Sequence, residues 1–167
     1  VDRLPEFDAL RDEALEIKNH TLANLDFYLE AAVARIEALG GTVHWCRDAA
    51  AARDTILAIC QAADARTATK SKSMVCEEIA LNEHLEAHDI EPVETDLGEY
   101  IIQLRDEPPS HIIAPAIHLS KEQVADTFRV HHRDLPGARS LDEPRELLDE
   151  ARSVLRERFV VADVGIT

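Results

Sequence analysis

The feature that most constrains the fold of this chain is a change of pattern at Gly40-Gly41. Before the two glycines, apolar residues recur at spacings of three and four over residues 6–39, which is typical of an amphipathic helix. After them, short apolar runs alternate with helical segments, and this alternation favours βαβ units. The sequence therefore predicts an α/β fold with a mostly parallel sheet and flanking helices, preceded by a long N-terminal helical arm.

The predicted arm covers residues 1–39, and the predicted α/β domain covers residues 40–167. Pro5 can open the arm helix and the double glycine can close it. At a rise of ~1.5 Å per residue, one continuous helix here would be roughly 50 Å long, which exceeds what a small domain needs. We therefore expect a break in the arm, at His20-Thr21.

Within the predicted domain, the short apolar runs are strand candidates and the segments between them are helix candidates. The predicted strands are 42–46, 66–69, 91–95 and 111–116, and the predicted helices are 49–63, 74–87, 97–105, 120–131 and 144–157. The last apolar run, 159–167, is predicted to form a buried strand that leads into a loop. Because nothing follows to cover that strand, we expect an incomplete domain, truncated at its C-terminus.

The charge of the chain limits its partners. It carries 33 acidic and 18 basic residues, for a formal net charge of −15, which opposes binding to nucleic acid or to an anionic membrane surface. No apolar run approaches the roughly 20 residues that would span a bilayer, and the first residues lack the features of a signal peptide. We therefore expect a cytoplasmic protein that has no membrane span and does not bind nucleic acid.

The cysteines predict neither a cluster nor a metal site. Cys46, Cys60 and Cys76 are widely spaced, without a CxxC pair or the tight run of cysteines that holds an iron–sulfur cluster. We expect free thiols, mostly buried. The histidine pairs His84/His88 and His131/His132 have no obvious third ligand, so no metal is predicted.

The segment Lys70-Ser71-Lys72-Ser73 is a candidate anion site. In an open parallel sheet, ligands gather beyond the carboxyl ends of the strands, where helix N-termini attract phosphate or carboxylate groups. Two lysines and two serines there would add charge and hydrogen-bond donors in an otherwise acidic chain. The alternative is a capped turn in which Ser73 caps the following helix and both lysines are solvated.

Two further loops supply candidates for the same cleft. Glu94 lies at the end of the strand predicted at 91–95, Asp96 and Glu99 follow it, and one of the three could act as an acid or base. The alternative is that Asp96 and Glu99 only form a capping box. His118 follows the strand predicted at 111–116 and precedes a capping box at Ser120, which predicts a position at the rim of the cleft.

Six segments of the chain carry a resemblance to a known family. They are EIKNHTLANLDFYLE (16–30), GGTVHW (40–45), KSKSMVCEEIALNEHLE (70–86), VETDLGEYIIQL (93–104), PSHIIAPAIH (109–118) and FVVADVGIT (159–167). With these segments the chain resembles the LUD-domain family, whose fold is similar to the NagB/RpiA/CoA-transferase-like fold. The resemblance covers nearly the whole chain.

The resemblance implies an iron–sulfur electron-transfer subunit of a cytosolic system that oxidises L-lactate to pyruvate. The implied partners are the other subunits of that system and a small anionic metabolite. Full-length members carry 4Fe-4S clusters in their C-terminal part, so none is expected in this chain. Two alternatives stay open: a self-contained small-molecule enzyme resembling sugar-phosphate isomerases or CoA transferases, and a non-catalytic scaffold whose arm docks a partner. The family implies no catalytic residue.

Overall fold

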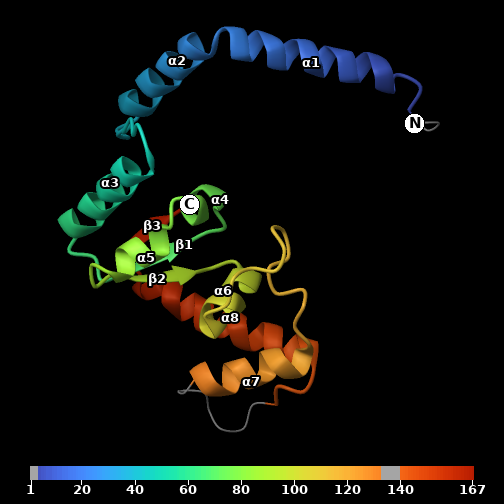
Figure 1. The fold of residues 1–167 in the computed structure, drawn as a ribbon, viewed down its shortest axis with the longest axis vertical. Coiled ribbons are helices and arrows are strands. Elements are labelled where there is room, and N and C mark those ends of the chain that lie inside the picture. The colour runs from blue at the N-terminus through green and yellow to red at the C-terminus, as the bar shows by residue number, and fades with distance from the viewer. Residues whose placement is uncertain (1–3, 133–139) are drawn as a thin grey trace. The chain divides into compact units, whose positions relative to one another are not determined.

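The computed structural model describes residues 4–132 and 140–167 (Figure 1). The chain divides into two compact units, Val1–Trp45 and Cys46–Thr167. Within the described residues, no helix combines the length and the apolar character that crossing a membrane requires.

The first unit consists of two helices, α1 (Phe7–Ala23) and α2 (Leu25–Ala38). The predicted break in the arm exists, but it lies at Asn24 rather than at His20-Thr21. Thr21 fits inside α1 because its hydroxyl donates to the carbonyl of Ile17, 2.9 Å away. The Asn24 side chain instead donates to the carbonyl of His20 at 2.8 Å and occupies a carbonyl at the helix end. Neither helix contains a buried residue.

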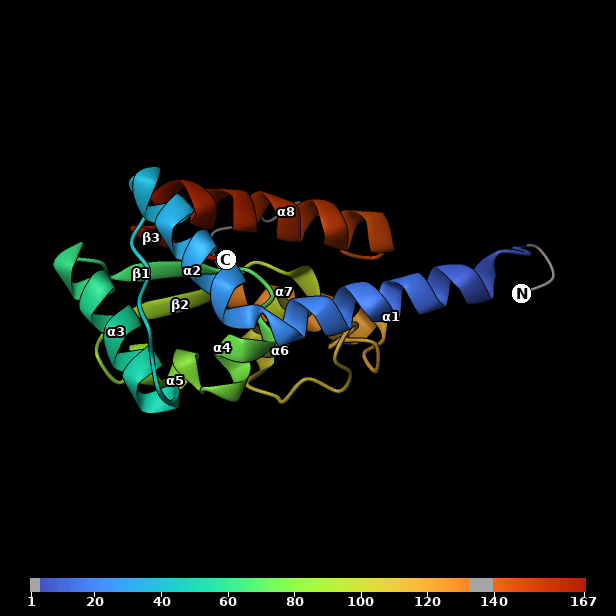
Figure 2. The same ribbon diagram turned by 90° about the horizontal axis from the view of Figure 1, so that it is seen from above.

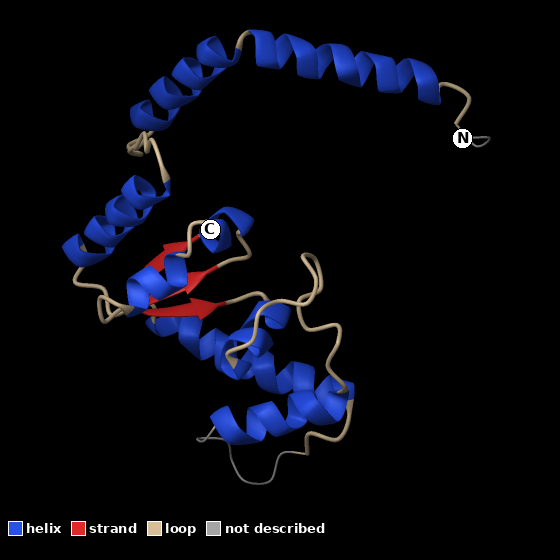
Figure 3. Cartoon of the chain, viewed as in Figure 1, coloured by secondary structure: helices blue, strands red, loops and turns tan. Residues whose placement is uncertain are grey.

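The second unit confirms the predicted fold class. Its elements, in order, are α3 (Ala49–Ala62), β1 (Thr67–Lys70), α4 (Met74–Glu78), α5 (Leu81–Glu86), β2 (Glu91–Glu94), α6 (Leu97–Arg105), α7 (Lys121–His131), α8 (Pro144–Val161) and β3 (Val164–Ile166). The three strands form one parallel sheet in the order β2-β1-β3, flanked by helices (Figure 3).

Side-chain contacts fix the register of β3 on β1. The Asp163 carboxylate accepts hydrogen bonds from the backbone N–H groups of Arg66 and Thr67, at 2.9 and 3.0 Å, directly before the first paired residues. These bonds hold the pKa of Asp163 below its ordinary value. The paired positions that follow begin with Ala68 opposite Val164.

The sheet separates two apolar cores, and α8 and α5 lie at its opposite faces (Figure 2). One core joins β2 to α6, α7 and α8; its buried residues are Val93, Tyr100, Ile101, Ala125, Phe128, Leu141, Leu147, Ala151 and Leu155. The other joins β1 to α3, α4 and α5; its buried residues are Leu57, Cys60, Ala65, Ala68, Cys76, Leu81, Leu85 and Ile90. Both faces of the sheet are therefore covered, as parallel sheets require.

Four helices begin at capping side chains, and three of these, Ser73, Asp96 and Ser120, are caps that the sequence indicates. Asp48, Ser73, Asp96 and Ser120 each accept a hydrogen bond from a backbone N–H three residues later. Ser120 and Gln123 form the predicted capping box. Glu99 does not complete a capping box with Asp96, because its carboxylate turns toward Lys72 instead.

The strand predicted at 42–46 is wrong. This segment has no regular secondary structure, and Trp45 is 70% exposed. A strand needs partners for its backbone groups, and this segment pairs with none of the three strands of the sheet.

The strand predicted at 111–116 is also wrong, because local hydrogen bonds replace a ladder there. The His111 ring accepts from the backbone N–H groups of Ile113 and Ala114, and the Ser110 hydroxyl donates to the carbonyl of Pro115. Such side-chain bonds to the backbone compete with strand pairing.

Two predicted helices differ in extent from the observed ones. The helix predicted at 74–87 is divided into α4 and α5, since Ala80 adopts the left-handed conformation at φ 52°. The helix predicted at 144–157 continues to Val161. The strand predicted within 159–167 is therefore only three residues long, Val164–Ile166.

A buried chain of polar groups connects α6 to α8 within the core that contains Phe128. The Tyr100 hydroxyl lies 2.9 Å from Nε2 of His132, and Nδ1 of His132 lies 3.1 Å from Glu150. The His132 ring also stacks on Phe128. Burial raises the pKa of Tyr100 to about 12, and burial lowers the pKa of His132 despite the opposing effect of Glu150.

We expect His132 to make the free energy of unfolding fall as the pH drops below its ordinary pKa of 6.5. The folded core disfavours the protonated ring, so the unfolded chain binds more protons in that range. Urea unfolding at a series of pH values between about 5 and 7.5 measures the effect. His132→Asn should flatten the pH dependence, whereas His131→Asn, at the exposed neighbour, should not. Identical slopes for both variants would contradict this assignment.

Candidate functional site

The candidate site lies where β1 and β2 end side by side. Lys70 is opposite Glu94 in the parallel register. Since side chains alternate along a strand, Lys70 points to the same face as Ala68, which belongs to the core of α3, α4 and α5. Lys70 is 1% exposed and Glu94 is 5% exposed. The strand register therefore brings two ionisable side chains together inside the protein.

The two side chains form an ion pair. Nζ of Lys70 lies 2.6 Å from Oε1 of Glu94, and the Asn82 amide on α5 donates to the same oxygen at 2.8 Å. Burial raises the pKa of Glu94 above its ordinary value, and the bonds from Lys70 and Asn82 oppose this rise. The Gln103 side chain accepts from the backbone N–H of Glu94 and donates to the carbonyl of Pro92, which fixes the end of β2 against α6.

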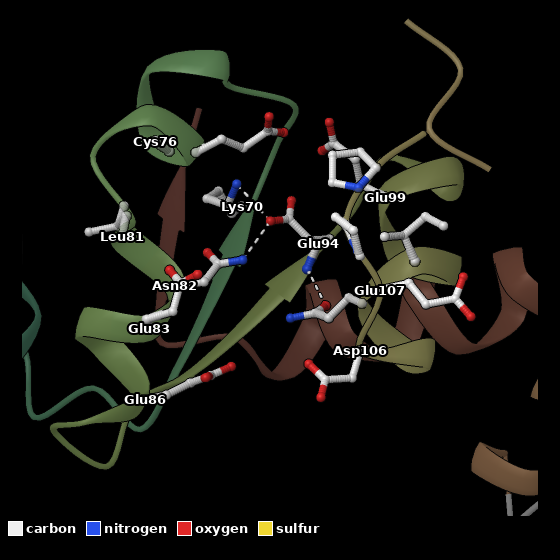
Figure 4. Close-up of a pocket in the computed structure, with 15 residues that line it drawn as sticks. Lys70, Cys76, Leu81, Asn82, Glu83, Glu86, Glu94, Glu99, Asp106 and Glu107 are labelled. Atoms are coloured by element: carbon white, nitrogen blue, oxygen red, sulfur yellow. Dashed lines mark hydrogen bonds and ion pairs between the residues drawn. The ribbon is translucent and has the colours of Figure 1, made fainter. Parts of the chain in front are cut away.

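A pocket of about 500 Å³ opens beside this pair (Figure 4). Its walls come from β1, α4, α5, β2, α6 and the loop after α6. Figure 4 shows Lys70, Asn82 and Glu94 pointing toward one another, with Glu99 across from them. The other lining residues are Cys76, Glu77, Leu81, Glu83, Glu86, Ile102, Gln103, Asp106, Glu107, Pro108 and Pro109.

The structure places the four residues of the predicted anion site in different environments. Lys70 is the last residue of β1 rather than a loop residue, and Ser73 caps α4. Lys72 is partly exposed and lies 3.5 Å from Asp96 and 3.3 Å from Glu99. The backbone N–H of Ser71 donates to the carbonyl of Ile166. Each lysine already has a carboxylate partner, so an anion would have to compete for it. The anion site stays a prediction.

His118 lies in the loop between α6 and α7 and does not line the pocket. Its Nδ1 is 2.7 Å from the Ser110 hydroxyl and its Nε2 is 3.4 Å from Glu107. Arg105 holds Glu107 at 2.6 Å and keeps the pKa of that carboxyl below its ordinary value. The Ser110 hydroxyl donates to the carbonyl of Pro115. The contacts of His118 therefore stabilise the loop and do not activate Ser110 as a nucleophile.

Of the predicted cleft residues, the pocket gathers Lys70, Glu94 and Glu99. Sequence reasoning missed Asn82 and Gln103, the two amides that hold Glu94. The sequence could have indicated Gln103, because it lies two turns into the helix that Asp96 caps. Helical side chains point toward the helix N-terminus, which directs Gln103 toward the end of the preceding strand. No comparable signal identifies Asn82, because it depends on the break at Ala80.

The cysteines do not assemble into a metal centre. Cys60 and Cys76 are buried free thiols, as predicted, whereas Cys46 is exposed. Burial raises the pKa of Cys60. Across residues 4–132 and 140–167, no three histidine, cysteine or acidic side chains are grouped to hold a metal ion.

Comparison with known proteins identifies the family. The LUD domain matches residues 29–167. The chain belongs to the LUD domain family. It is 45% identical over 165 residues to Lactate utilization protein B of Bacillus licheniformis, and 43% identical over 168 residues to Lactate utilization protein B of Bacillus subtilis. The matches cover 98% and 100% of the chain, but only 34% of each relative. No solved structure matches the chain.

The LUD-domain chain should depend on its buried ion pair for stability. Lys70→Met leaves a buried carboxylate without its cation, and breaking such a pair typically costs about 3–5 kcal/mol. Lys121→Met removes an exposed cation and should cost less than about 1 kcal/mol. Urea unfolding of the two variants measures the difference.

A double variant separates the pair from other effects of the substitution. Lys70→Met with Glu94→Gln removes both charges and should recover most of the stability that Lys70→Met loses. If the double variant is as unstable as the sum of the single ones, the two side chains do not stabilise each other.

Proposed function

We propose that this chain is part of an iron–sulfur electron-transfer subunit in a system that oxidises L-lactate to pyruvate. One observation carries the proposal: the identity of 43–45% to proteins named Lactate utilization protein B extends across essentially the whole chain. The proposed partners are the other subunits of that system, and the proposed compartment is the cytoplasm.

The chain spans about a third of the length of these relatives, so the electron-transfer groups need not lie within it. The residues present do not fit a 4Fe-4S cluster, because such a cluster takes four thiolates and the chain has three widely separated cysteines. We propose that cysteine clusters lie in the part of the protein that corresponds to the remaining length of the relatives. This chain then supplies the α/β domain with its pocket.

Growth on L-lactate tests the proposal. A strain that lacks the gene should fail to grow on L-lactate as carbon source and should still grow on pyruvate, because only the oxidation of lactate is lost. Restoring the complete gene should restore growth. Unchanged growth of the deletion strain on L-lactate, or a complete gene without cysteine clusters, would show that the assignment is wrong.

A second candidate function is a small-molecule enzyme that uses acid–base chemistry. The observation that favours it is the buried Lys70–Glu94 pair at the edge of a pocket of about 500 Å³. Burial raises the pKa of Glu94, which is the direction that suits a carboxyl group for proton transfer near neutral pH. Of the three acidic candidates, Glu94 is the one paired with a buried lysine.

This candidate predicts proton exchange by the purified chain alone. Deuterium uptake from D₂O into 2-hydroxy acids or sugar phosphates, followed by NMR, should occur without partner proteins. Glu94→Gln should slow it by roughly 10²–10⁴-fold if Glu94 transfers the proton. Circular dichroism of the variant shows whether it is folded, and Glu157→Gln, at an exposed position of α8 outside the pocket, is the matched control. Absence of exchange with the folded chain would exclude this function for the substrates tested.

A further inference from the structure

The pocket contains buried acceptor atoms that lack donors. Oε2 of Glu94, Oε2 of Glu99 and Oδ1 of Asn82 have no hydrogen-bond partner among the residues that the structure describes. Glu94 and Glu99 are only 5% and 7% exposed. All three residues line the pocket (Figure 4). Buried acceptors are normally satisfied, so these atoms indicate a ligand that donates hydrogen bonds.

The charge of the walls restricts what that ligand is. Glu94, Glu99 and five further acidic residues line the pocket: Glu77, Glu83, Glu86, Asp106 and Glu107. The single lysine of the lining, Lys70, forms an ion pair with Glu94 at 2.6 Å, although its Nζ makes no hydrogen bond of regular geometry among the described residues. An anion inside would meet like charges, whereas a positively charged donor would make charge-assisted hydrogen bonds. A metal ion is not favoured, because it would need grouped ligands that the described residues do not provide.

We propose that this pocket binds a small organic cation, whose ammonium or guanidinium N–H groups donate to the free acceptors of Glu94, Glu99 and Asn82. The proposal does not depend on the lactate assignment. It competes with the acid–base function, because that function would bring anionic substrates into the same pocket. The proposed ligand is a cation, whereas the ligand predicted at residues 70–73 is an anion. Measuring the binding of cationic, neutral and anionic probes therefore distinguishes the two assignments.

Three probes of matched length test the charge of the ligand. They are 1,4-diaminobutane, 1,4-butanediol and succinate, each added to the purified chain in isothermal titration calorimetry at low salt. The diamine should bind, added salt should weaken it, and the diol and succinate should bind at least tenfold more weakly. Preferential binding of succinate, equal binding of diol and diamine, or no binding of the diamine would each overturn the proposal.

Substitution of Glu99 tests the location. Glu99→Gln leaves the Lys70–Glu94 pair intact and removes one carboxylate from the pocket, so the variant should fold. It should weaken binding of the diamine about tenfold or more, as expected for the loss of one charge-assisted hydrogen bond. The matched control is Glu157→Gln, on an exposed position of α8, which should leave binding unchanged. Equal affinities of both variants for the diamine would place any binding outside this pocket.

Discussion

The ion pair between Lys70 and Glu94 is the constraint around which the second unit is arranged. Removing two charges from water is costly unless each finds a partner, and here the partner is supplied by the neighbouring strand in the same register. A shift of β2 by one residue relative to β1 would turn Glu94 to the opposite face and leave Lys70 without its partner. Glu94 would then enter the apolar core that contains Val93 and Phe128. The pair therefore favours one alignment of β1 and β2 over its nearest competitors.

The helices around the pair follow from the same requirement. The amide of Asn82 reaches Glu94 because Ala80 takes up a left-handed conformation and starts α5 in a new direction. The amide of Gln103 bonds two backbone groups of β2, the carbonyl of Pro92 and the N–H of Glu94, so α6 is tied to that strand by polar contacts as well as by its buried face. The walls of the pocket are therefore the elements that satisfy the buried charges.

Signals confined to a few neighbouring residues could be read from the sequence, and signals that depend on distant partners could not. The caps at Ser73, Asp96 and Ser120, the parallel sheet, and the strands near 67–70 and 91–94 follow from local patterns. The segments 42–46 and 111–116 have the apolar character of strands but pair with no strand of the sheet. The burial of Lys70 was not predictable, because lysine is almost always exposed and its partner lies in another strand.

The sign of charge at the site is likewise a property of the fold. Along the chain, Lys70 and Lys72 form a positive segment in an acidic sequence, and that contrast suggests an anion. In space, the strand end and the capped helices bring carboxylates from α4, α5 and α6 to the same place, where Lys70 is paired with Glu94 and Lys72 lies near Glu99. The lysines are then the counterions of a negative pocket. As an isolated segment, Lys70 and Lys72 would attract an anion. In the fold they reduce, but do not cancel, the negative charge of the neighbouring carboxylates.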